Sequence, residues 1–188
     1  YFFIFEPNSD DYKSYYDAIA SNYETFTPQN KEMRKFIINF LQELKIKKDA
    51  KLLDFGAGTG IVTEGVAEAG YANLTLADIS KEELNIAKKK SSLKKSKFIL
   101  IDLTRDNIPG KFDVIFETMS LDYFKGEKMK DILQKIRGAL NNNGKFIVID
   151  RHIYPEFNEF FKEIKNGKIS LQTPEGLFDY YFFIGEKN

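Results

Sequence analysis

The sequence predicts one α/β domain in which helices cover both faces of a mostly parallel β-sheet. Its 188 residues fall within the usual size of a single domain. Hydrophobic residues make up 43% of the chain, with 18 Phe and 10 Tyr, which is enough to fill such a core. From about residue 50 onward, short runs rich in Leu, Ile, Val and Phe alternate with helix-like stretches. This alternation is typical of parallel strands joined by crossover helices.

Two helices are expected before the first strand, at residues 10–23 and 30–44. The second has an apolar stripe along one helical face. Five strands should follow, because each is a short apolar run that suits burial on both faces. These strands are 51–55, 74–78, 97–101, 112–117 and 145–150, and helices are expected between them at 60–68, 81–90 and 126–140.

The helix at 126–140 should end in a turn, because Asn141, Asn142, Asn143 and Gly144 suit left-handed backbone. A helix at 156–164 and two strands, at 168–171 and 180–184, complete the predicted elements. Residues 1–6 nearly repeat residues 181–186. Chance explains this repeat in so aromatic a chain, and pairing at a sheet edge is the structural alternative.

Composition narrows the classes of function. The chain has no Cys and a single histidine, His152, so we expect no disulfide, no thiolate metal site and no metal site built from several histidines. Basic and acidic residues number 28 each, whereas nucleic-acid-binding proteins usually have a basic surplus. No apolar run reaches the length of a membrane span, and no signal peptide is recognised. The expectation is a cytoplasmic protein that contacts neither membrane nor nucleic acid.

The strongest local signal is a glycine-rich turn, residues 54–60, between the first strand and its helix. Gly56, Gly58 and Gly60 allow backbone to approach a ligand closely, and the turn lies at the sheet edge where α/β proteins bind ligands. The spacing differs from the dinucleotide fingerprint, and Ile61 stands where that fingerprint has Gly or Ala. Asp54 would repel a pyrophosphate but would attract the cationic groups of S-adenosylmethionine.

Two further acids end predicted strands. Asp78 suits hydrogen bonds from the cis hydroxyls of a ribose. Its alternative role is in the turn before the next helix, with Ser80 as the better helix cap, and both roles are compatible. Asp102 could accept a hydrogen bond from the adenine amine, with Leu103 beside the ring. The alternative is a solvated aspartate at the end of a strand.

These segments resemble, in order and spacing, the motifs of class I (Rossmann-like) S-adenosylmethionine-dependent methyltransferases. The similarity covers residues 50–150 and is carried by DFGAGTG, LADIS, LIDL, FDVIFETMSLDYF and LNNNGKFIVID. The end of the chain resembles the sixth strand and the antiparallel seventh strand of that family. The resemblance therefore implies a three-layer, Rossmann-like fold with a seven-stranded, mostly parallel sheet and an antiparallel last strand.

Upstream, YDAIASNY resembles a helix of the small-molecule branch, which includes ubiquinone- and menaquinone-biosynthesis-like enzymes. In that branch the helix covers the cofactor, so residues 1–45 are expected to form a helical cap over the compact unit 46–188. Tyr16 and Tyr23 become candidate lid contacts, with aromatic core packing as the alternative.

The resemblance implies S-adenosylmethionine as cofactor and a place for each matching residue. The glycine-rich turn would surround the methionine moiety and Asp54 would hold its amino group directly or through water. The ribose and adenine would meet the next two strand ends, and the loop after the fourth strand would lie near the methionine end. The complete expected cofactor set is Asp54, Gly56, Ala57, Gly58, Gly60, Asp78, Ile79, Asp102, Leu103, Glu117, Met119, Tyr16 and Tyr23.

The chain departs from the amino-methylating enzymes of this family at one place. Those enzymes have an Asn/Asp-Pro-Pro-aromatic motif after the fourth strand, whereas Glu117, Thr118, Met119 and Ser120 stand here. Methylation of nucleic-acid adenine or of a glutamine amide is therefore disfavoured.

The expected reaction is direct methyl transfer from S-adenosylmethionine to an O, N or C nucleophile of a small metabolite. A general base is needed only where the nucleophile must lose a proton. Asp122 and His152 are the candidate catalytic residues and Glu117 is a weaker one, although a lone histidine is more often a surface residue. Alternatives are an RNA or protein methyltransferase acting with a partner, and a non-catalytic cofactor-binding module. The short segment between the fifth and sixth strands leaves the acceptor pocket open, unless the first helices or a homodimer partner close it.

Overall fold

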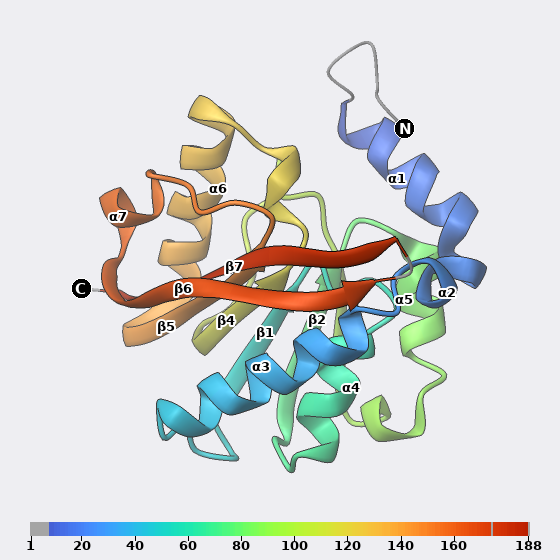
Figure 1. Ribbon diagram of the computed structural model, residues 1–188, viewed down its shortest axis with the longest axis horizontal. Coiled ribbons are helices and arrows are strands. Elements are labelled where there is room, and N and C mark those ends of the chain that lie inside the picture. The colour runs from blue at the N-terminus through green and yellow to red at the C-terminus, as the bar shows by residue number, and fades with distance from the viewer. Residues whose placement is uncertain (1–7, 174, 188) are drawn as a thin grey trace.

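The computed structural model describes residues 8–173 and 175–187, so the repeat at residues 1–6 lies outside the described residues. Within this part of the chain, one sheet contains seven strands in the order β3-β2-β1-β4-β5-β7-β6 (Figure 1). Among these strands, β7 alone runs in the opposite direction, so it pairs antiparallel with both of its neighbours, β5 and β6. The predicted fold class is confirmed. The strands are β1 (Lys51–Phe55), β2 (Asn73–Asp78), β3 (Lys97–Leu100), β4 (Phe112–Thr118), β5 (Leu140–Asp150), β6 (Lys162–Thr173) and β7 (Gly176–Glu186).

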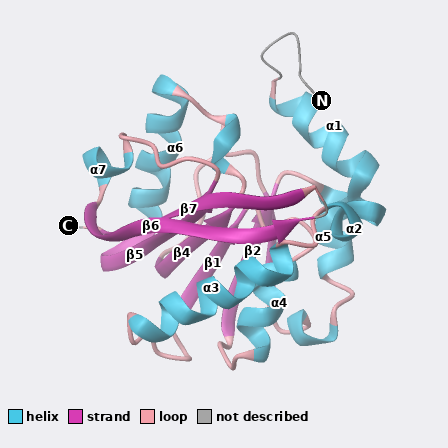
Figure 2. Ribbon diagram, in the orientation of Figure 1, coloured by secondary structure: helices cyan, strands magenta, loops and turns pink. Residues whose placement is uncertain are grey.

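Helices cover the sheet on both faces, as Figure 2 shows. Side chains alternate along each strand. Leu52 of β1 therefore packs with α3 (Asn30–Glu43) and α4 (Ile61–Glu68), whereas Leu53 packs on the opposite face with α6 (Gly126–Ala139) and with α7 (Phe157–Phe160). α5 (Lys81–Ala87) packs against Leu76 of β2. Two apolar layers thus hold the carboxyl ends of the parallel strands in place.

The amino-terminal helical segment is divided where one helix was predicted. α1 (Ser9–Ile19) is followed by a 3-10 turn, η1 (Ala20–Asn22), and by α2 (Tyr23–Phe26). The side chain of Asn8 accepts hydrogen bonds from the Asp10 and Asp11 amides, and the Asp11 carboxylate accepts one from the Asn8 amide. This reciprocal capping box fixes the start of α1.

Three predictions near the end of the chain need correction. The expected helix 156–164 is wrong beyond Phe160, because Lys162 already pairs with Glu186 and begins β6. The expected turn at residues 141–144 belongs to β5, although Asn143 does have left-handed backbone, with φ 59°. A register shift between Phe112 and Val114 of β4 accommodates these additional residues. The last two strands are also longer than predicted, because the backbone groups of β6 and β7 hydrogen-bond to each other along a long hairpin.

Among the described residues, no helix combines the length and the apolar character that crossing a bilayer requires.

Candidate functional site

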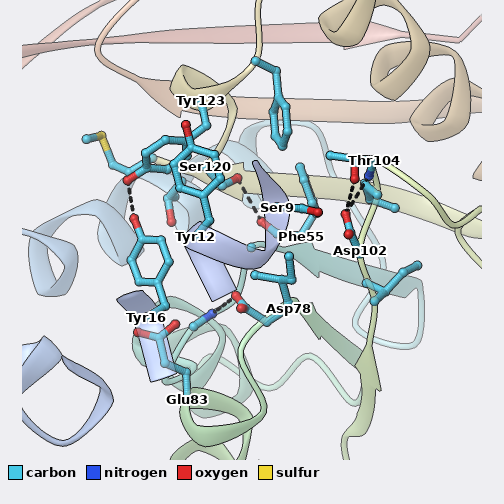
Figure 3. A pocket seen from close by; sticks show the side chains of 18 of the residues that line it. Ser9, Tyr12, Tyr16, Phe55, Asp78, Glu83, Asp102, Thr104, Ser120 and Tyr123 are labelled. Atoms are coloured by element: carbon cyan, nitrogen blue, oxygen red, sulfur yellow. Dashed lines mark hydrogen bonds between the residues drawn. The ribbon is translucent and has the colours of Figure 1, made fainter. Parts of the chain in front are cut away.

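A cavity of about 730 Å³, part of it open to solvent, lies at the carboxyl ends of β1, β2 and β4. α1 contributes Ser9, Tyr12 and Tyr16 to its wall (Figure 3). Nine residues of the expected cofactor set line it: Tyr16, Tyr23, Gly56, Gly58, Asp78, Ile79, Asp102, Leu103 and Met119. Four members do not line it: Asp54, Ala57, Gly60 and Glu117.

The three glycines of the turn have left-handed backbone but different surroundings. Their φ angles are +66° at Gly56, +53° at Gly58 and +74° at Gly60. A Cβ on Gly60 would lie 2.9 Å from side-chain atoms of Leu76 and Leu93, so this glycine allows the start of α4 to lie close to β2 and to the 3-10 turn η2 (Ser91–Leu93). Gly58 instead faces the cavity, and Gly56 lies against Ser120. The first two glycines therefore belong to the site, and the third belongs to the core.

Asp54 is buried and does not line the cavity. One carboxylate oxygen accepts a short hydrogen bond from the Thr63 hydroxyl, and Oδ1 has no partner among the described residues. Burial raises the pKa of Asp54 to about 8, and the nearby Asp78 contributes to the increase. Because a nearby positive charge lowers the pKa of a carboxyl group, a cation bound close to Asp54 would favour its ionised form.

Asp78 has the role in the turn before α5 that its position suggested, and it also lines the cavity. Its Oδ1 accepts a hydrogen bond from the Ser80 amide at 2.8 Å, and its Oδ2 accepts one from the Gly58 amide at 2.7 Å. Ser80 caps α5, because its hydroxyl accepts the Glu83 amide hydrogen at 3.1 Å. Burial raises the pKa of Asp78. The carboxylate thus joins the glycine-rich turn to the start of α5 and also forms part of the cavity wall.

Asp102 lines the cavity beside Leu103 and Thr104. Its Oδ1 accepts hydrogen bonds from the Thr104 amide at 2.9 Å and from the Thr104 hydroxyl at 2.6 Å. Burial opposes the charged form, but these hydrogen bonds and the nearby Arg105 outweigh it and lower the pKa of Asp102. Asp102 is therefore an ionised acceptor at this end of the cavity.

Glu117 shapes the site from behind its wall. Its Oε2 accepts hydrogen bonds from the Ser120 amide at 2.9 Å and from the Ser120 hydroxyl at 2.7 Å. This contact holds the loop after β4, in which Met119 has left-handed backbone, with φ 65°. Burial and the charge of Asp150 raise the pKa of Glu117. Burial also raises the pKa of Asp150, to about 6.

Tyrosines from α1 and from the loop after β4 meet over the cavity (Figure 3). The Tyr16 and Tyr123 hydroxyls form a short hydrogen bond, and the ring centroids of Tyr12 and Tyr123 lie 4.7 Å apart. Burial raises the pKa of Tyr16, so this hydroxyl stays protonated. Asp17 fastens the same helix to α5 by accepting the Ser80 hydroxyl hydrogen at 2.7 Å.

The two candidate catalytic residues lie together, outside the cavity lining. His152 Nε2 is 3.6 Å from Asp122 Oδ1, and this oxygen also accepts the Tyr154 hydroxyl hydrogen at 2.7 Å. The His152 side chain is 65% exposed. Asp122 precedes Tyr123 in the 3-10 turn η3 (Leu121–Tyr123), so the group adjoins the tyrosine side of the site.

The lining also contains residues outside the expected cofactor set, among them Ser9, Tyr12, Glu83 and Thr104. Tyr12 precedes Tyr16 by one helical turn, and this i, i+4 spacing on one face was a usable signal. Glu83 gave the opposite signal, because a glutamate three residues after a serine cap usually completes a capping box.

The charges of the site match a cationic nucleoside. Among the described residues, three carboxyl groups line the cavity, from Asp78, Glu83 and Asp102, and no Lys, Arg or His side chain does. Three buried carboxylate oxygens of the described chain have no hydrogen-bond partner: Asp54 Oδ1, Glu83 Oε1 and Glu117 Oε1. Of these three residues only Glu83 lines the cavity, where a bound ligand could reach its carboxyl group directly. S-Adenosylmethionine carries an ammonium, a sulfonium and ribose hydroxyls, which suit an acidic wall better than a pyrophosphate does.

Comparison with known proteins agrees with this geometry. A family model described as "Methyltransferase domain" matches residues 52–144, about half of the chain. A ribosomal protein L11 methyltransferase of Lactobacillus acidophilus is 28% identical over 138 residues, and the match covers 71% of this chain but only 42% of that protein. An uncharacterised methyltransferase of Staphylococcus carnosus is 25% identical over 165 residues, covering 85% of this chain and 78% of the relative.

The fold is also that of a solved methyltransferase. Magnesium protoporphyrin IX methyltransferase from Synechocystis PCC 6803, crystallised with bound S-adenosylmethionine, superposes with a TM-score of 0.80. The superposition covers 100% of both chains at 12% sequence identity, so the similarity is one of fold. With the family match and the related sequences, it shows that this chain belongs to the class I S-adenosylmethionine-dependent methyltransferases.

Proposed function

We propose that this protein transfers the methyl group of S-adenosylmethionine to a small-molecule acceptor. The observation that carries the proposal is the cavity at the carboxyl edge of the sheet, which within the described chain is lined by three acidic residues and by no basic one. Such a wall favours a nucleoside with positive charge over one with phosphates. The tyrosines of α1 cover this cavity, which suits an acceptor small enough to enter beneath them.

The cavity residues suggest how the cofactor is held. Gly56 and Gly58 would face the methionine moiety, where Asp54 would attract the ammonium through a water molecule. Asp78 would accept hydrogen bonds from the ribose. Asp102 and Leu103 would meet the adenine, and Ile79 would pack against it, while Tyr16 and Tyr23 would cover the whole. The bound cofactor supplies a methyl group already activated by the positive sulfur.

The protein's main contribution would be orientation. Holding the nucleophile in line with the methyl carbon can lower the barrier by about 7–11 kcal/mol. The acceptor would enter beside Met119 and Tyr123. Where its nucleophile must lose a proton, His152 would accept that proton and Asp122 would stabilise the resulting imidazolium, since the two side chains are 3.6 Å apart.

A second candidate function is methylation of a protein, favoured by the 28% identity to the ribosomal protein L11 methyltransferase. The chain spans less than half of that relative's length, so such an acceptor would require a recognition surface supplied by a partner. In a homodimer, the second copy of this chain could close the cavity over a small acceptor. A cofactor-binding module without turnover is the third reading.

A thermal-shift experiment tests the cofactor and a labelling experiment tests the acceptor. S-Adenosylhomocysteine at 100 times its Kd should stabilise the fold by about 2.7 kcal/mol, and NAD should have no effect. The protein is then given methyl-labelled S-adenosylmethionine with separate small-molecule, protein and RNA fractions of a cell extract. Label in the small-molecule fraction supports the proposal. Label in protein or RNA alone would refute it, as would stabilisation by NAD.

A further inference from the structure

Glu83 is a buried carboxyl group in the wall of the cavity. It lies in the first turn of α5 and is only 3% exposed. It lines the cavity, and its Oε1 has no hydrogen-bond partner among the described residues. Figure 3 shows its carboxyl group at the end of the cavity that also holds Asp78, below Tyr16. Burying an unpartnered polar group costs stability, so this side chain requires an explanation beyond the fold.

The structural role that the sequence suggests for Glu83 is already filled by another residue. In a capping box, the glutamate would accept the amide hydrogen of the cap, Ser80. Here Asp78 accepts that hydrogen at 2.8 Å. The Ser80 hydroxyl caps the Glu83 amide, and Asp17 accepts the Glu82 amide hydrogen at 3.2 Å. The start of α5 is therefore satisfied without the Glu83 carboxyl group.

Glu83 and Asp78 approach the same point of the glycine-rich turn. The Gly58 amide donates to Asp78 at 2.7 Å. A Cβ built on Gly58 would lie 3.1 Å from Glu83 Oε2 and 3.8 Å from Cε1 of Tyr23. Both carboxyl groups thus flank one backbone position that faces the cavity. Burial and the charge of Asp78 raise the pKa of Glu83 to about 9, so the group is neutral at pH 7 in the free protein.

We propose that Glu83 is a second ribose-binding group, which together with Asp78 engages the two cis hydroxyls of the cofactor. The inference rests on the proposed binding of S-adenosylmethionine. Each oxygen of Asp78 already accepts one backbone hydrogen bond, whereas Glu83 Oε1 is free. A neutral carboxyl group offers both a donor and an acceptor, which suits neutral hydroxyls better than an ammonium group.

The experiment uses Glu83→Met, which keeps an unbranched side chain but removes the carboxyl group. Glu82→Met is the matched control, because Glu82 is exposed in the same helical turn. Calorimetry measures binding of three probes: S-adenosylhomocysteine, 5′-methylthioadenosine, which lacks the amino acid, and the 2′,3′-dideoxy form of S-adenosylhomocysteine. Binding of the first probe to the unmodified protein tests the proposed function separately.

Glu83→Met should lower the affinity for S-adenosylhomocysteine and for methylthioadenosine about 10-fold or more each. Its affinity for the dideoxy probe should fall less than 2-fold, because that probe has no hydroxyls that could lose a hydrogen bond to the carboxyl group. Glu82→Met should bind all three probes as the unmodified protein does. A loss that disappears with methylthioadenosine would assign Glu83 to the amino acid and overturn the proposal. An equal loss with the dideoxy probe would overturn it in favour of packing.

Thermal unfolding without ligand separates binding from structure. Because Glu83→Met removes an unpartnered buried carboxyl group, its melting temperature should equal or exceed that of the unmodified protein. A lower melting temperature would show that the carboxyl group supports the fold, and would overturn a role in the ligand alone.

Discussion

Replacing Gly60 by alanine tests whether the glycines of the turn divide between core and site. At φ +74° a side chain costs about 1–2 kcal/mol. The added Cβ would also lie 2.9 Å from both Leu76 Cδ2 and Leu93 Cδ1, and 3.1 Å from Ala87 Cβ. Overpacking of this kind costs about 1–3 kcal/mol. The variant should therefore lose about 2–5 kcal/mol of unfolding free energy, a large part of the stability of an ordinary domain.

Gly58→Ala is the matched variant, because it adds the same atom two residues earlier. Its φ of +53° brings the same backbone cost of about 1–2 kcal/mol. However, its nearest neighbour is Glu83 Oε2 at 3.1 Å, the end of a flexible side chain. We expect a smaller loss of stability than for Gly60→Ala, and a larger loss of cofactor affinity, because the new Cβ enters the cavity.

Urea unfolding measures the first effect and calorimetry with S-adenosylhomocysteine measures the second. If both alanine variants lost equal stability, the distinction between a packing glycine and a binding glycine would be wrong. If Gly60→Ala were as stable as the unmodified protein, the close approach of Gly60 to Leu76 and Leu93 would not exist as described.

Three further predictions follow from the carboxyl and tyrosine groups. Folding raises the pKa of Asp54 to about 8 from its usual value near 4. The unmodified protein should therefore lose stability more steeply than Asp54→Asn as the pH rises from 4 to 8. Urea unfolding at several pH values measures this difference, and parallel curves of stability against pH would contradict it. Tyr16→Phe should cost about 0.5–1.5 kcal/mol and speed cofactor release in stopped-flow assays, because the bond to Tyr123 is lost; unchanged release would argue against a lid. For an acceptor that must lose a proton, Asp122→Asn and His152→Gln should each lower methyl transfer at least 10-fold without changing S-adenosylhomocysteine affinity, and unchanged rates would exclude a base there.

The central sheet could be predicted because its strands are continuous apolar runs. β1 has the predicted bounds, and β2, β3 and β4 differ from prediction by one residue at an end. The hairpin β6–β7 was predicted too short, because its outer residues, such as Lys162 and Lys165, are polar and exposed. Their strand conformation comes from pairing with β7 over a long range, which local sequence does not encode.

The site was predictable where a residue is placed by its strand. Asp78 is the last residue of β2 and Asp102 follows β3, so the topology brings them to the same edge. Glu117 also ends a strand, but its side chain turns toward Ser120 and supports the loop instead of lining the cavity. The sequence pattern predicts where a strand ends, whereas the orientation of the side chain there depends on which hydrogen-bond donors lie next to it.

Glu83 shows why a local rule fails where a distant group competes for the same hydrogen. The serine-to-glutamate spacing predicts a closed capping box. Asp78 accepts the Ser80 amide hydrogen instead, and the glutamate is left in the cavity without a partner among the described residues. Near the glycine-rich turn, Asp54, Asp78 and Glu83 are buried carboxyl groups, and burial raises the pKa of each. Hydroxyls and positive charge suit such groups and a phosphate does not, so we expect the groups that weaken the empty fold to be those that select the cofactor.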